Sequence, residues 1–91
     1  MGKVIVTIKI LPENPDVDLS IIEKKGEKVI NKFGEFVKTE IFSIGFGIKQ
    51  LNIIMLLDED KAELLETIEN ELKAIEGVGS VEIIDVRRAI G

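Results

Sequence analysis

The chain has 91 residues, of which 45% are hydrophobic, and this suits one folded domain. It has no cysteine and no histidine, which excludes disulfides and thiolate metal sites and removes the usual general base of enzymes. Its 12 basic and 17 acidic residues give a formal charge of −5, the wrong sign for following a phosphate backbone. We therefore expect a cytoplasmic binding protein without cofactors that contacts neither nucleic acid nor membrane directly.

The N-terminal part of the chain predicts a strand followed by a helix. Residues 3–11 alternate between apolar and polar side chains, as in a half-buried strand, and Pro12 ends it because proline cannot donate to a ladder. Asp16 or Asp18 can cap the helix that follows, since a short carboxylate accepts hydrogen bonds from its free N–H groups. The apolar residues of this helix lie on one stripe and predict its buried face: Leu19, Ile22, Val29, Ile30 and Phe33.

Two glycines belong to this predicted helix. Gly26 lies on the apolar stripe, where glycine costs about 1 kcal/mol relative to alanine, so we expect close packing against the sheet to compensate. Gly34 follows the stripe and predicts the end of the helix, in the left-handed conformation that glycine tolerates best.

The second half of the chain predicts a hairpin, a helix and a last strand. Residues 36–44 and 48–57 predict two strands joined by a turn at residues 45–47. The acidic residues 58–60 complement the dipole of a second helix that begins there, and residues 81–86 form the last strand. The expected buried face of the second helix consists of Leu64, Leu65, Ile68, Leu72 and Ile75.

The order strand, helix, strand, strand, helix, strand indicates the architecture. Each βαβ crossover should be right-handed, which yields a ferredoxin-like βαββαβ sandwich of class α+β. We predict a four-stranded antiparallel sheet with both helices on one face and the other face open. Because no linker or low-complexity tract interrupts residues 1–91, we expect a single domain.

The segment Gly45-Phe46-Gly47 is the first candidate functional feature. The residues alone favour a hairpin turn in which the glycines supply positive φ and Phe46 folds into the core. The alternative is an exposed aromatic anchor, a type of residue that often dominates an interface. A phosphate-binding loop is disfavoured, because neither the G-x-x-G spacing nor a following helix N-terminus is present.

Two charged segments are the other candidates. Arg87 and Arg88, at the mobile end of an acidic chain, could reach a phosphate or carboxylate pocket, although solvated charges are common at chain ends. Residues 58–60 with Glu63 could hold a divalent ion, but the dipole of the second helix explains these acids better. We therefore predict no metal site.

Taken in order, these segments resemble the archaeal elongation factor 1-beta family. The similar stretches are residues 6–12, 15–19, 76–78 and 85–88, and residues 44–51 resemble the core of the same domain in eukaryotic relatives. Together these stretches run along essentially the whole chain. The resemblance implies guanine-nucleotide exchange on elongation factor 1-alpha, the GTPase that delivers aminoacyl-tRNA to the ribosome. It implies the same ferredoxin-like fold, and an exchange factor in place of an enzyme that makes or breaks covalent bonds.

The resemblance also implies which residues bind the partner. In this family the aromatic residue of the glycine-aromatic-glycine turn contacts the GTPase, which implies docking by Phe46 between Gly45 and Gly47. A basic residue near the chain end is placed toward the Mg²⁺ and phosphate site of the GTPase. Its position matches Arg88, with Arg87 beside it. The expected state of the free protein is a monomer.

Two other functions use this architecture. A regulatory ACT-type module would pair its sheet edges as a dimer around a small metabolite, and this is the alternative prediction. An acylphosphatase-type enzyme would need a positive phosphate loop after the first strand, where Glu13 places an acid instead. That enzyme class is therefore disfavoured.

Overall fold

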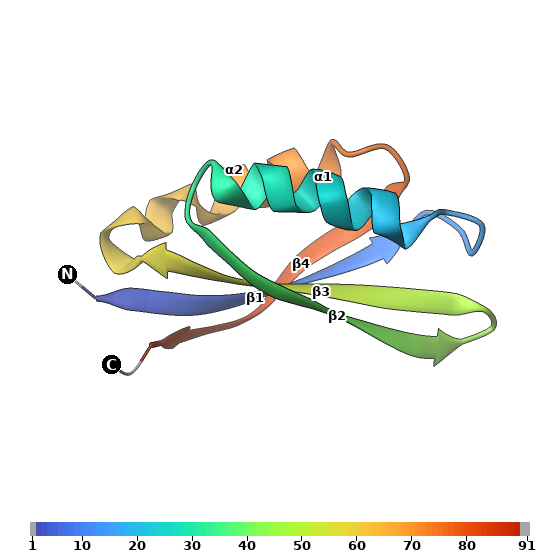
Figure 1. Cartoon of the computed structure of the whole chain (residues 1–91), viewed down its shortest axis with the longest axis horizontal. Coiled ribbons are helices and arrows are strands. Elements are labelled where there is room, and N and C mark those ends of the chain that lie inside the picture. Colours follow the sequence, from blue (N-terminus) through green and yellow to red (C-terminus); the bar gives the residue numbers. More distant parts are fainter. Residues whose placement is uncertain (1, 90–91) are drawn as a thin grey trace.

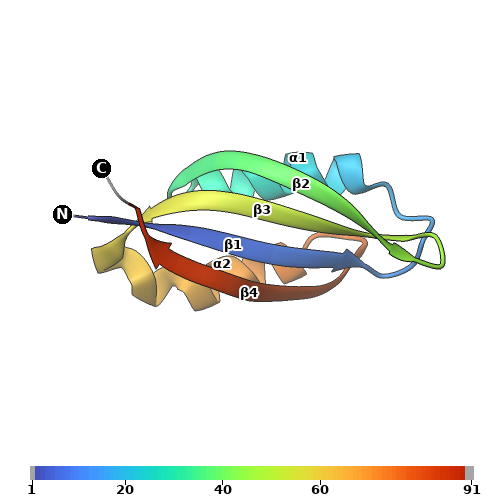
Figure 2. The same cartoon turned by 90° about the horizontal axis from the view of Figure 1, so that it is seen from below.

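The computed structural model describes residues 2–89 and shows one sheet with two helices packed on the same face (Figure 1). The elements are β1 Lys3–Pro12, α1 Leu19–Asn31, β2 Glu35–Gly45, β3 Ile48–Asp58, the 3-10 helix η1 Glu59–Leu64, α2 Leu65–Lys73 and β4 Val78–Arg88. The four strands are antiparallel and lie in the order β2-β3-β1-β4, which Figure 2 shows from the open face. The predicted ferredoxin-like α+β sandwich is confirmed.

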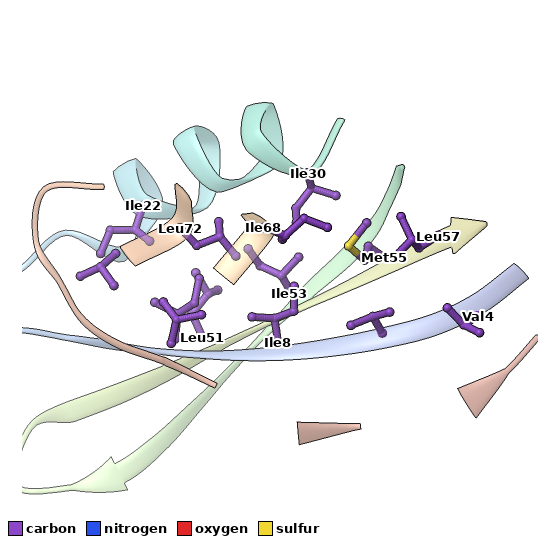
Figure 3. Packing of buried hydrophobic residues seen from close by; sticks show 14 residues of the cluster. Val4, Ile8, Ile22, Ile30, Leu51, Ile53, Met55, Leu57, Ile68 and Leu72 are labelled. Carbon is purple, nitrogen blue, oxygen red and sulfur yellow. The ribbon is translucent and has the colours of Figure 1, made fainter. Parts of the chain in front are cut away.

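The core lies between the helices and the two central strands (Figure 3). Alternate residues of a strand point to the same face, and the register of β1 with β3 places their buried residues opposite one another. These pairs are Val4 with Leu57, Val6 with Met55, Ile8 with Ile53 and Ile10 with Leu51. The helices close the layer with the fully buried side chains Ile22, Ile30, Ile68 and Leu72. The edge strands β2 and β4 carry most of the large exposed apolar side chains.

The structure confirms the expectation for Gly26 and corrects the one for Gly34. Gly26 is buried against the sheet, where a Cβ would lie 3.0 Å from Cδ1 of Ile53. Gly34 does not adopt the left-handed conformation predicted for it. A Cβ at Gly34 would lie 2.3 Å from the carbonyl oxygen of Leu56. Glycine is therefore required there because the chain passes close to the backbone of β3.

The second helical segment begins at Glu59, close to where it was predicted, but its first six residues form the 3-10 helix η1 and not an α-helix. β3 continues to Asp58, which is extended and pairs with Lys3 of β1, so the acidic residues follow directly from a strand. They enter η1, which has non-helical angles at Lys61, and α2 begins only at Leu65. Glu59 and Asp60 therefore lie in the first turn of η1, whereas the acidic residue in the first turn of α2 is Glu66. Within residues 2–89, acidic side chains form no cluster of three or more that could hold a metal ion.

Asp18, rather than Asp16, caps α1. Its Oδ1 accepts hydrogen bonds from the Ser20 hydroxyl at 2.7 Å and from the Ser20 N–H at 2.9 Å. These two bonds, in that order of importance, lower the pKa of Asp18 below its ordinary value of 3.8. A lowered pKa means that the ionised carboxylate stabilises the fold above the unfolded pKa, and that this contribution is lost as the pH falls through the folded pKa.

We expect the cap to give a specific pH dependence. The difference in melting temperature between the parent and Asp18→Asn should narrow when the pH is lowered from about 6 to about 2.5, because the parent then loses its charged cap. Thermal unfolding followed by circular dichroism measures this difference. Asp16→Asn leaves the cap bonds in place and serves as the control. A constant difference across this range would contradict the assignment of the cap.

Candidate partner-binding site

The turn between β2 and β3 has an unusual backbone. Gly45, Phe46 and Gly47 have φ values of 100°, 56° and 76°. Because Gly45 pairs with Ile48, Phe46 and Gly47 form a two-residue loop with positive φ at both positions. Such loops prefer Asn-Gly or Gly-Gly, since a left-handed conformation is unfavourable for a bulky side chain. The predicted turn is confirmed, and its backbone does not favour phenylalanine.

The expectation that Phe46 folds into the core is wrong. Its side chain is 99% exposed, the highest value among the exposed large hydrophobic residues. The turn lies at the far end of the hairpin, beyond the core, and a Cβ placed on either flanking glycine would meet no atom within 4 Å. Nothing in the described chain is therefore near enough to cover the ring.

Phe46 combines two unfavourable features at one position. A left-handed conformation costs a residue with a side chain roughly 1–2 kcal/mol, and full exposure forgoes the gain from burying an aromatic ring. Neither the turn nor the core requires phenylalanine at this position. Strained conformations of this kind cluster at functional sites, so this observation favours the aromatic anchor.

The hairpin around Phe46 is an apolar arm, which we define as residues 41–48. The arm contains no charged residue, whereas 32% of the whole chain is charged. Ile41, Phe42 and Ile44 are each close to half exposed. A groove of about 300 Å³ adjoins the arm, and both apolar and polar residues line it: Pro12, Pro15, Val17, Asp18, Leu19, Ser20, Ile41, Gly47 and Lys49. The contiguous apolar surface of the arm itself is typical of a binding site.

Arg87 and Arg88 are strand residues and do not form a mobile end. The predicted strand of residues 81–86 extends to Arg88 because the register with β1 continues through these positions. The next residue, Ala89, still donates a backbone hydrogen bond to the carbonyl oxygen of Lys3 at 2.9 Å. The direction of each arginine is therefore set by the sheet.

The two arginines point to opposite faces of the sheet. Arg88 lies opposite Val4, whose side chain belongs to the core, so Arg88 is on the face that carries the helices. Arg87 lies opposite Ile5 and therefore faces the open side. One partner surface that approaches a single face can consequently meet only one of the two guanidiniums.

Each arginine also has its own acidic neighbour. Asp85 accepts from Nε of Arg87 at 2.8 Å and from Nη2 at 3.4 Å, and this pairing raises the pKa of Arg87. Nη2 of Arg88 lies 3.1 Å from Oε2 of Glu59. Sequence reasoning did not identify either acid as a partner of these arginines. Asp85 could have been found, because residues two apart on a strand share a face, whereas Glu59 is distant in sequence.

The apolar arm and the arginines lie at opposite ends of the sheet (Figure 2). The molecule measures 42 Å along its longest axis and 22 by 17 Å across it. A partner that touches both Phe46 and Arg88 must therefore extend along most of the molecule or contribute two separate regions. Among residues 2–89, no helix is long and apolar enough to cross a membrane.

Comparison with known proteins gives close matches along the whole sheet and both helices. Residues 5–89 match the EF-1 guanine nucleotide exchange domain. "Elongation factor 1-beta" of Methanothermobacter thermautotrophicus is 39% identical over 88 residues, which cover 97% of this chain and 98% of the relative. The protein of the same name from Nanoarchaeum equitans is 35% identical over 82 residues, which cover 90% of this chain and 100% of the relative.

Solved structures with the same architecture have lower sequence identity. The ACT domain from the GTP pyrophosphokinase of Chlorobium tepidum, solved by NMR, has a TM-score of 0.64 and 24% identity over 93% of this chain and 90% of that one. A putative antibiotic biosynthesis monooxygenase from Bacillus cereus has a TM-score of 0.52 and 17% identity over 100% and 96% of the two chains. At these identities the likeness concerns the fold alone. It gives the ACT-type alternative no support as a function.

Proposed function

The chain belongs to the EF-1 guanine nucleotide exchange family, and on this premise we propose that it promotes the exchange of GDP for GTP on elongation factor 1-alpha during translation elongation. The observation that carries the proposal is the 39% identity to an elongation factor 1-beta over nearly the full length of both chains. We further propose that the protein acts as a monomer in the cytoplasm, and that it makes and breaks no covalent bond.

The proposed mechanism is a competition between two ligands of the GTPase. A GTPase holds GDP through P-loop amides, a lysine and Mg²⁺, so a partner that displaces the ion or the switch contacts weakens nucleotide binding. Reciprocity requires that the nucleotide weaken partner binding by the same factor. GDP therefore leaves the complex faster, and rebinding of GTP expels the exchange factor.

We assign the two ends of the sheet to different parts of this competition. Phe46, with Gly45 and Gly47 shaping its turn, anchors the complex through an exposed aromatic ring on an apolar arm. Arg88 approaches the phosphate and Mg²⁺ site of the GTPase, because its side chain is 79% exposed and guanidinium donors match phosphate and carboxylate oxygens. Arg87 has a smaller role, since it faces the other side and is paired with Asp85.

The proposal is tested by release of a fluorescent GDP analogue from elongation factor 1-alpha. Addition of this protein at micromolar concentration should accelerate release, and the rate should saturate as its concentration rises. An unrelated acidic protein of similar size controls for non-specific effects. A release rate equal to that of the GTPase alone at all concentrations would contradict the proposed function.

The oligomeric state provides a second measurement. Light scattering of the free protein should give the mass of one chain. A dimer that is stabilised against heat by an amino acid would instead favour the ACT-type alternative.

A further inference from the structure

Three strand ends meet beside Arg88. The N–H of Glu59, directly after β3, donates to the carbonyl oxygen of Gly2 at 3.0 Å. β4 is fixed to the other side of β1, where Ala89 donates to Lys3. The backbones that carry Glu59 and Arg88 are therefore both held by the start of β1, although β3 and β4 are not neighbours in the sheet.

Glu59 and Arg88 form an ion pair whose two side chains differ in their exposure to solvent. Nη2 of Arg88 lies 3.1 Å from Oε2 of Glu59, and the two side chains are 79% and 32% exposed. The Glu59 carboxylate packs beside Gly2, where an added Cβ would lie 3.2–3.3 Å from its carbon and oxygen atoms. Glu59 is thus the sheltered and confined member of the pair, and Arg88 is the member that faces solvent.

We propose that Glu59 is a positioning residue that orients the Arg88 guanidinium toward the phosphate or carboxylate groups of the GTPase. This inference rests on the proposed function. A guanidinium carries five N–H donors, and Glu59 approaches only Nη2 of Arg88, as an ion pair, so the donors stay available to a partner. An arginine drawn toward a neighbouring carboxylate loses less rotamer freedom when it enters the nucleotide site after docking, which favours that step.

The contacts of Arg87 support the choice of Arg88, and not Arg87, as the arginine that approaches the GTPase. Asp85 occupies both Nε and Nη2 of Arg87, so one edge of that guanidinium is used within its own strand. Glu59 approaches only Nη2 of Arg88, so more N–H donors are unoccupied on the Arg88 guanidinium than on that of Arg87. The helix-bearing face therefore presents the guanidinium with the larger number of unoccupied donors.

The test is Glu59→Gln in the GDP-release assay, with the protein concentration varied to separate the maximal rate from the half-saturating concentration. We expect the maximal rate to fall about fivefold and the half-saturating concentration to change less than about twofold, because docking by Phe46 is unaffected. Glu59→Asp keeps the charge and should restore part of the rate. Glu82→Gln, which breaks the exposed pair with Lys9, removes the same charge elsewhere and should exchange at the parent rate.

A double variant separates positioning from a general effect of charge. If Glu59 acts through Arg88, adding Glu59→Gln to Arg88→Ala should slow release no further. Glu59→Gln at or above the parent rate, with Arg88→Ala slow, would overturn the positioning role and leave the proposed function standing. If the parent protein did not accelerate GDP release at all, both the positioning role of Glu59 and the proposed function would be overturned. Unchanged melting temperatures of the single variants exclude loss of the fold as the cause.

Discussion

Phe46→Ala should raise the half-saturating concentration for catalysed GDP release about thirtyfold, which corresponds to about 2 kcal/mol of lost binding energy. The reason is that the ring is 99% exposed at the tip of an uncharged arm and makes no contribution to the core. The maximal rate at saturation should change far less, since the substitution leaves the proposed contact of Arg88 with the nucleotide site in place. The measurement is the release rate of fluorescent GDP at rising protein concentrations.

The same position should show the opposite effect on stability. Phe46→Asn places a residue that tolerates the left-handed region at φ 56°, so the free energy of unfolding should rise by about 1 kcal/mol. Chemical denaturation measures this change. If Phe46→Asn weakens exchange and also makes the fold more stable, the phenylalanine side chain serves binding. Replacing a structural residue would lower both the exchange activity and the stability.

Ile84→Ala serves as the matched control for the Phe46 substitutions. Ile84 is 44% exposed on β4, away from the arm, so its removal takes away apolar surface without touching the proposed anchor. We expect it to leave the half-saturating concentration unchanged. If Phe46→Asn behaved like Ile84→Ala in the exchange assay, the ring would not be the anchor.

Local patterns were enough to predict the architecture. The alternation in residues 3–11 identifies the buried face of β1, and the apolar stripe with Gly26 identifies the face of α1 that packs on the sheet. The start of α2 was not predictable in the same way. The pairing of Asp58 with Lys3, a contact between segments far apart in sequence, fixes the end of β3. The acidic residues then begin a helical segment, but its first part is the 3-10 helix η1, so α2 starts only at Leu65.

The site was harder to predict than the fold, for a related reason. Hydrophobicity favours burial of Phe46, and only the length of the hairpin beyond the core shows that nothing covers the ring. The separation of Arg87 from Arg88 follows from the register with β1, which the sequence does not show. Family resemblance identified both positions without giving their geometry. The geometry is what favours Arg88 over Arg87 in the proposed contact with the GTPase, and it places Glu59 beside Arg88.

Arg88→Ala should lower the maximal rate of catalysed GDP release about tenfold or more, with a smaller change in the half-saturating concentration. The guanidinium is assigned to the nucleotide site, where it acts after docking, and binding energy comes mainly from the apolar arm. Loss of the exposed pair with Glu59 should cost the fold less than about 1 kcal/mol, so the melting temperature stays near that of the parent.

Two further substitutions determine whether the guanidinium or merely a positive charge is needed. Arg88→Lys keeps the charge and loses the planar fork, so it should recover only part of the rate. Arg87→Ala removes the neighbouring charge from the opposite face and should have a smaller effect than Arg88→Ala. Equal losses from the two alanine variants would mean that the net charge at this end of the sheet matters, and that the direction set by the register of β4 does not.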